Sequence, residues 1–192
     1  LFFKIRMNIP TGELVFSSTL VLVGGTCSGF IVGRITDSYG CRGIRVIFQS
    51  LQILLLLFLP FITSETPFLS YVIGIIFFLF GFLMWGSASI GYIFMLNYVP
   101  KNNKESFMSL AYSLDGFIAG ITTVLAGYFV LWLDLNNILI FGKILGSYEV
   151  LFIICAFIIA VSMNAFILIK EDGAMGVRTF IRQLIFSRRQ LP

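Results

Sequence analysis

Long apolar stretches alternate with short charged clusters along the whole chain. The hydrocarbon core of a bilayer is ~30 Å thick and a helix rises ~1.5 Å per residue, so about 20 consecutive apolar residues can cross it. Five stretches meet this condition, and only the fourth has a charged residue away from its ends, Asp115. The pattern therefore predicts five membrane-spanning helices, at about residues 14–34, 46–64, 68–97, 106–133 and 150–169.

The third stretch is the longest and lies between Glu65 and Lys101. Two antiparallel spans would need about 40 residues and a turn, so this stretch predicts one long or tilted helix. Pro67 and Pro100 bracket it and suit the ends of a helix. After the fourth helix, the polar interval 134–149 predicts a loop.

Composition supports a membrane protein and excludes several kinds of chemistry. The chain is 58% hydrophobic and 11% charged, with a mean hydropathy of +1.00, whereas soluble domains are ~25% charged. We therefore expect an all-α integral membrane protein. It has no histidine, and its three cysteines lie far apart, so we expect neither a metal site nor a cofactor.

Two further classes of function are disfavoured by the charged residues. Asp115 is the only ionisable side chain inside a predicted span, with no second carboxylate or nucleophile beside it, so we do not expect an enzyme. The net charge of +4 is small and spread along the chain, so we do not expect a nucleic acid partner.

Basic residues predict the orientation of the helices, because cytoplasmic loops of membrane proteins carry an excess of Lys and Arg. Most of the 13 basic residues fall on one side of the predicted bundle. The first-to-second loop, the third-to-fourth loop and the C-terminus are therefore predicted to be cytoplasmic, in a multi-pass protein of the inner or plasma membrane. The cytoplasmic set is Arg34, Arg42, Arg45, Lys101, Lys104, Lys170, Arg178, Arg182, Arg188 and Arg189, and the opposite set is Lys4, Arg6 and Lys143.

The two ends of the chain differ from its apolar middle. Residues 1–13 are typical of the end of a preceding helix followed by an external segment, not of a signal peptide. We therefore expect the later part of a larger membrane protein, or a broken copy of one. Residues 170–192 predict a basic amphipathic helix at the cytoplasmic interface beside anionic lipid, with a disordered tail as the alternative. Its apolar face is Val177, Phe180, Ile181, Leu184 and Ile185.

The segment between the first two predicted helices reads Gly-Arg-Ile-Thr-Asp-Ser-Tyr-Gly-Cys-Arg from residue 33 to residue 42. It resembles the signature loop of the major facilitator superfamily of secondary transporters, Gly-x-Leu-x-Asp-Arg-x-Gly-Arg-Lys/Arg. Ser38 and Cys41 depart from that pattern, since both positions are usually basic. The matching residues are Gly33, Ile35 in place of Leu, Asp37, Gly40 and Arg42.

This resemblance implies a fold, a function and partners. The third helix lacks an Arg and the fourth lacks a Gly-Pro-x-x-Gly-Gly run, so the five helices resemble helices eight to twelve of the family. The implied function is secondary active transport of a small solute by alternating access, as a symporter or antiporter. The implied partners are that solute, membrane lipid and an N-terminal helix bundle, supplied by the same chain or a separate one.

A non-transporting protein of the same fold is the alternative. Such a chain would be a membrane remnant or an accessory interaction subunit. The upstream coding sequence discriminates between the two, since about seven further helices in frame would support the transporter.

Small residues recur at helical spacing on two of the predicted helices. Gly25, Gly29 and Gly33 share a face of the first helix, and Ala119, Thr123 and Gly127 share a face of the fourth. Small residues let helix backbones approach closely in lipid. These faces either slide against the partner half during transport or pack within one bundle.

Asp115 is the strongest candidate for the transport pathway. It lies roughly 14 Å into the membrane along its helix, where a charge is costly and by default marks a function. Tyr112, Ala119 and Thr122 share its side of the helix and predict a polar stripe. A structural pairing with another helix is the alternative.

Trp85, Ser89 and Tyr92 fall at i, i+4 and i+7 on the third helix. Trp85 and Ser89 are further pathway candidates, because Trp85 lies near the membrane midplane and its ring could stack on a solute. Aromatic residues in such a helix also serve packing, and Tyr92 also fits the interfacial aromatic belt.

Overall fold

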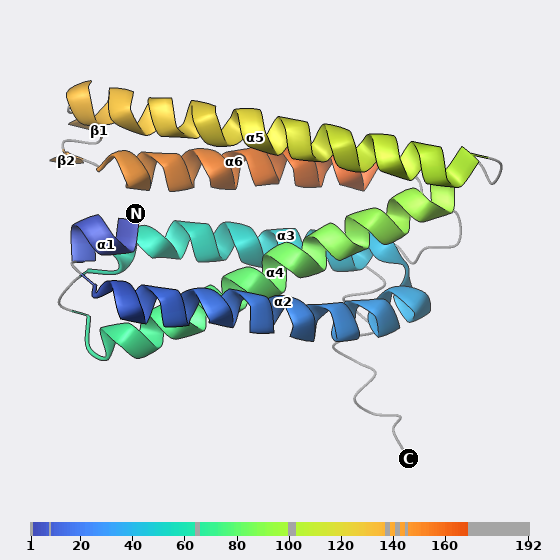
Figure 1. Ribbon diagram of the computed structural model, residues 1–192, viewed down its shortest axis with the longest axis horizontal. Coiled ribbons are helices and arrows are strands. Elements are labelled where there is room, and N and C mark those ends of the chain that lie inside the picture. Colours follow the sequence, from blue (N-terminus) through green and yellow to red (C-terminus); the bar gives the residue numbers. More distant parts are fainter. Residues whose placement is uncertain are drawn as a thin grey trace, which may run out of the picture.

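The computed structural model describes residues 2–7, 9–63, 66–99, 103–136, 139–140, 143–144 and 146–168, and it is built from helices (Figure 1). A single pair of two-residue strands interrupts them within this described part, with Leu139 opposite Ile144. In chain order the elements are α1 (Phe2–Met7), α2 (Thr11–Tyr39), α3 (Cys41–Phe58), the 3-10 turn η1 (Leu59–Phe61), α4 (Leu69–Tyr98), α5 (Lys104–Asn136), β1 (Leu139–Ile140), β2 (Lys143–Ile144) and α6 (Ser147–Leu168).

The prediction of an all-α protein with five potential membrane spans is confirmed. Within the described residues, five helices are long and apolar enough to cross a membrane: α2, α3 with η1, α4, α5 and α6. Their side chains are apolar around most of the helix circumference, and the large hydrophobic residues on their outer faces are exposed. Such faces are expected where lipid, rather than water, surrounds the helices.

The helices begin earlier or end later than the apolar stretches indicate. The predicted loop between residues 34 and 46 is helical except at Gly40, where the chain reverses between α2 and α3. Gly40 has a φ of 81°, which favours glycine, and its amide donates to the carbonyl of Thr36 at 2.9 Å. Charged residues end an apolar stretch but not the backbone hydrogen bonding of a helix, and α5 likewise runs from Lys104 to Asn136.

The helices pack in the spatial order α2, α4, α3, α6, α5. α4 packs against both α2 and α3, and α6 packs against both α3 and α5. In Figure 1, α4 crosses the others obliquely and rises toward the start of α5. α5 lies at the edge of this arrangement, and almost none of its side chains is buried.

The closest helix contact joins α2 and α4 through two buried glycines. A Cβ atom added to Gly24 would overlap with the carbonyl oxygen of Phe78, and one added to Gly81 would overlap with that of Val21. The predicted glycine face of α2 lies beside this contact rather than in it. A Cβ added to Gly25 would lie 2.6 Å from the Trp85 ring, whereas one added to Gly29 or Gly33 would meet no atom within 4 Å.

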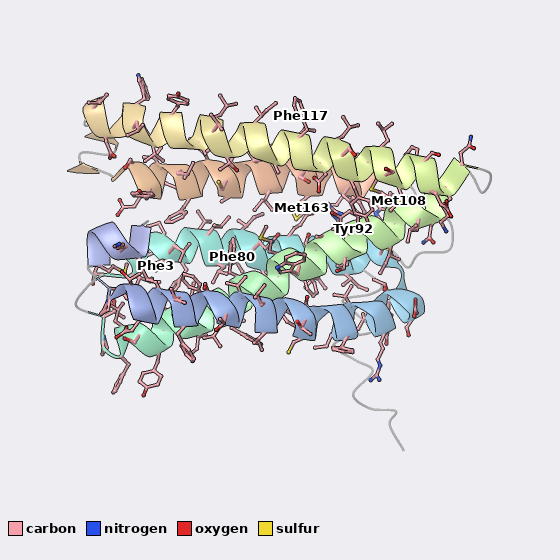
Figure 2. All side chains as sticks on the ribbon, viewed as in Figure 1. Phe3, Phe80, Tyr92, Met108, Phe117 and Met163 are labelled. Atoms are coloured by element: carbon pink, nitrogen blue, oxygen red, sulfur yellow. The ribbon has the colours of Figure 1, made fainter. Side chains whose placement is uncertain are left out.

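Polar side chains join α3 to α6 inside the bundle. Gln49 Nε2 donates to Ser162 Oγ at 3.3 Å, and Ser50 lies 3.4 Å from the sulfur of Met163. Met163 lies between the two helices (Figure 2). Two apolar clusters complete the interior. One comprises Met7, Ile9, Leu56, Leu59, Ile62, Ile73, Ile76 and Ala156, and the other Val32, Cys41, Ile44, Phe48, Leu83 and Ile90.

One end of the bundle collects basic residues. The turn at Gly40, the end of α4, the start of α5 and the end of α6 lie together at the right of Figure 1. Arg34, Arg42, Arg45 and Lys104 belong to these segments. This is the end that the charge pattern predicts to be cytoplasmic. Lys101 and the predicted interfacial helix in 170–192 lie outside the described residues.

Candidate functional site

A pocket of about 660 Å³ lies between α4 and α5 near the basic end of the bundle. Small-molecule sites typically measure ~300–1,000 Å³. Helical spacing explains how two helices line it, because residues three or four apart share a face. The lining residues are Ala88, Gly91, Tyr92, Phe94 and Met95 from α4, Phe107, Leu110, Ala111, Leu114, Asp115 and Ile118 from α5, with Arg45 from α3 and Phe166 from α6.

Asp115 faces α4 at the edge of this pocket. The hydroxyl of Tyr92 donates to Oδ2 of Asp115 at 3.3 Å, and the Tyr92 ring lies 4.8 Å from the Tyr112 ring between centroids. Tyr92 stands on the half of α4 that rises toward α5 (Figure 2). Asp115 and Tyr112, both predicted as pathway residues, therefore meet at Tyr92.

Arg45 brings a positive charge to the same pocket. Its guanidinium carbon lies 4.5 Å from the centroid of the Phe166 ring, within the range of a cation–π interaction. Its Nε is buried and has no hydrogen-bond partner among the residues that the structure describes. Gly91 makes room for it, because a Cβ added there would overlap with Nη1 of Arg45.

The two charges do not neutralise each other directly. Within the described part of the chain, Arg45 and Asp115 form no ion pair with one another, although both line the pocket. The remaining lining is mostly apolar, with Asp115 exposed and Arg45 half-buried. The pocket can therefore hold an anionic group at one point and a cationic group at another.

Three other predicted pathway residues lie away from the pocket. Trp85 is 51% exposed and covers Gly25 on α2, so its contact in this chain is helix packing. Thr122 donates to the carbonyl of Ile118 within its own helix at 2.7 Å. Ser89 is half-buried on α4 and is not part of the lining.

Sequence reasoning missed Arg45, Gly91 and Phe166. Arg45 lies at the end of an apolar stretch, and this position indicates a charged residue in a loop. Its place in the first turns of α3 follows only from the tight turn at Gly40. Gly91 directly precedes Tyr92, but nothing in the sequence indicates which long side chain fills the space that it leaves. The tilted ring contact between Phe94 and Phe166 also depends on the packing of α4 near α6.

The signature-loop residues lie at the same end of the bundle as the pocket. Gly33 and Asp37 are in the last turns of α2, and Asp37 is exposed. Gly40 forms the turn, and Arg42 is the second residue of α3. Nη2 of Arg42 donates to the carbonyl of Ile167 in the last turn of α6, so the arginine of this segment links α3 to α6.

The small residues of α5 are not part of the pocket lining. A Cβ added to Gly116, Gly120 or Gly127 would meet no atom within 4 Å. Ala119 and Thr123 on the same helix are exposed. A second hollow of about 500 Å³ lies over Gly116 and Gly120. Phe117 projects from α5 on the side away from α6 (Figure 2). Gly116 and Gly120 thus line a different hollow from the one that Asp115 lines.

The described residues contain no group of three His, Cys, Asp or Glu side chains that could hold a metal ion. Comparison with known proteins finds no matching family model, no matching curated protein and no matching solved structure.

Proposed function

We propose that this chain is the C-terminal part of a secondary transporter of the major facilitator type and moves a small solute by alternating access. The observation that carries the proposal is the pocket between α4 and α5. It places Asp115 and Arg45, from two different membrane-length helices, around a space of about 660 Å³. Charged side chains inside the membrane usually face a cavity and mark a path for substrates or ions.

The signature-like segment adds support. Gly40 provides the tight turn between α2 and α3 with a positive φ, and Arg42 holds the end of α6. A turn of this kind fixes the relative positions of α2, α3 and α6. The bundle can then move as a unit against a second bundle, as alternating access requires.

The position of α5 suits this mechanism. α5 packs mainly against α6, and its glycine face is open. The proposed N-terminal bundle would cover this face, because small residues permit close helix contacts in lipid. Rocking of this bundle against the second one would then change the side of the membrane from which the pocket and Asp115 are reached.

Cysteine accessibility tests alternating access without knowledge of the solute. In the protein as its gene encodes it, Cys27, Cys41 and Cys155 are first replaced by Ala. Ala111→Cys then places one thiol in the pocket lining. A membrane-impermeant maleimide is applied to intact cells and to inverted membrane vesicles. We expect labelling from both sides, because each half-cycle opens the pocket to one of them.

Two control positions report the topology in the same preparations. Ser38→Cys near the Gly40 turn should be labelled only in inverted vesicles. Leu135→Cys, at the opposite end of the bundle and 82% exposed in the wild type, should be labelled only in intact cells. Labelling of Ala111→Cys from a single side, with both controls behaving as expected, would favour the non-transporting accessory subunit instead.

A further inference from the structure

The pocket offers two unlike charges to one occupant. The guanidinium of Arg45 has a buried Nε without a partner among the described residues, and the carboxylate of Asp115 accepts a hydrogen bond from Tyr92. No ion pair joins Arg45 and Asp115 in that part of the chain. Charged groups in an apolar environment are stable when an opposite charge compensates them. Each group is therefore best satisfied by a charge on the occupant.

The rest of the pocket lining is mostly apolar. Gly91 and Ala88 of α4 form a shallow wall, and Leu114 and Ile118 of α5 face it. Aromatic rings lie at the arginine end, where Phe166 underlies the guanidinium and Phe94 packs against Phe166. This surface suits an uncharged hydrocarbon or aromatic group, because burying such a group removes apolar area from water.

We infer that the pocket binds a small zwitterion with an apolar side group, an inference that rests on the proposed transport function and names its substrate class. The anionic group lies on Arg45, and the cationic group lies on Asp115 beside the Tyr92 hydroxyl. A simple anion leaves Asp115 uncompensated, and a simple cation leaves Arg45 uncompensated. Either leaves one charge of the apolar-lined pocket without an opposite charge, so the pocket favours the molecule with both charges.

Gly91 is a positioning residue in this arrangement. The space left by its missing side chain is occupied by the end of the Arg45 side chain. Gly91→Ala removes no charge, but its added Cβ would overlap with Nη1 of Arg45, so the guanidinium has to shift. It is therefore expected to weaken only the binding of molecules that carry an anionic group.

Three probes of one shape test the charge requirement: L-phenylalanine, which is zwitterionic, 2-phenylethylamine, which is cationic, and 3-phenylpropanoate, which is anionic. Equilibrium binding of each radiolabelled probe is measured on the complete protein, purified in detergent. We expect L-phenylalanine to bind about tenfold or more tightly than either singly charged probe, since each lost charge removes a charge-assisted hydrogen bond.

Variants assign the two ends of the solute. Arg45→Gln should weaken the binding of L-phenylalanine about tenfold or more without weakening that of 2-phenylethylamine. Asp115→Asn should weaken the binding of L-phenylalanine without weakening that of 3-phenylpropanoate. Thr122→Val is the matched control on α5, because Thr122 lies outside the pocket lining. Arg45→Lys keeps the charge, so it should retain a preference for the zwitterion even if Arg45→Gln fails to fold.

Other outcomes would overturn the inference. These are a singly charged probe that binds as tightly as L-phenylalanine, the absence of binding by all three probes, or equal weakening of all probes by Gly91→Ala. None of these results bears on the labelling of Ala111→Cys from both sides, which uses no solute. Conversely, zwitterion binding with labelling from one side only would retain the substrate class and reject transport.

Discussion

Gly24 and Gly81 bring the backbones of α2 and α4 into direct contact, each facing a carbonyl group of the other helix. Both glycines are buried. Without a hydrophobic driving force between helices in lipid, van der Waals packing of this kind holds a membrane bundle together. α4 crosses α2 obliquely at this contact, and its second half, which carries Tyr92, rises toward α5 (Figure 2).

Gly81→Ala should destabilise the bundle, because the added Cβ overlaps with a carbonyl oxygen that cannot move without shifting α2. Overpacking of this kind costs ~1–3 kcal/mol. We expect a lower melting temperature for the detergent-purified protein. Gly29→Ala is the matched control, since Gly29 has open space around it. Equal melting temperatures for the two variants would show that α2 and α4 do not meet at Gly81.

Arg42→Gln should loosen the end of α6. The wild-type guanidinium donates to the carbonyl of Ile167, and hydrogen bonds of charged groups contribute ~1.5–3 kcal/mol. We expect faster proteolysis near the end of α6 in membranes. Arg34→Gln serves as the control, because Arg34 is exposed in α2. If the two variants are cleaved at the same rate, Arg42 does not hold α6.

Tyr92→Phe should affect the cationic end of the proposed zwitterionic solute. The change removes the hydroxyl that donates to Asp115 and keeps the ring that packs on Tyr112. One hydrogen bond is worth ~1 kcal/mol, so the affinity for 2-phenylethylamine should fall about fivefold. The affinity for 3-phenylpropanoate should stay the same. Comparable changes for both probes would mean that Tyr92 shapes the whole pocket rather than its acidic end.

The sequence is informative about spans and much less so about contacts. Five apolar stretches predict the five long helices, because each is long enough, as a helix, to cross the hydrocarbon core of a membrane. Asp115 stands out because it is a lone charge in such a stretch. The ends of the helices were misplaced by several residues, since Arg34 and Asp37 interrupt hydrophobicity without interrupting the helix.

Packing partners could not be read from the spacing of small residues. The repeat at Gly25, Gly29 and Gly33 suggested one face of α2, yet the closest contact uses Gly24 and Gly81. Two helices that cross obliquely approach at one point, so a single pair of glycines matters more than a repeated stripe. Arg45 joins the pocket for a similar reason, because its long side chain reaches a gap on α4 that only the fold creates.

Asp115→Asn separates an electrostatic role from a packing role. Asn keeps the shape of the side chain and can still accept the hydrogen bond from Tyr92, but it has no charge. If the carboxylate binds the coupling ion or the ammonium group of the solute, the variant should insert normally and lose uptake against a gradient. Exchange of solute already bound on both sides needs no net movement of the coupling ion, so exchange should be less affected.

Vesicles that contain the complete purified protein allow both measurements. Uptake of radiolabelled L-phenylalanine is followed with an imposed proton or sodium gradient, and exchange is followed with unlabelled L-phenylalanine inside. Ser113→Ala is the control on the same helix, because the Ser113 hydroxyl donates to the carbonyl of Ser109 within α5 and is not part of the pocket lining. An Asp115→Asn protein that accumulates solute as well as this control would remove the carboxylate from the coupling step. In that case, the wild-type contact with Tyr92 would serve only to hold α5 against α4.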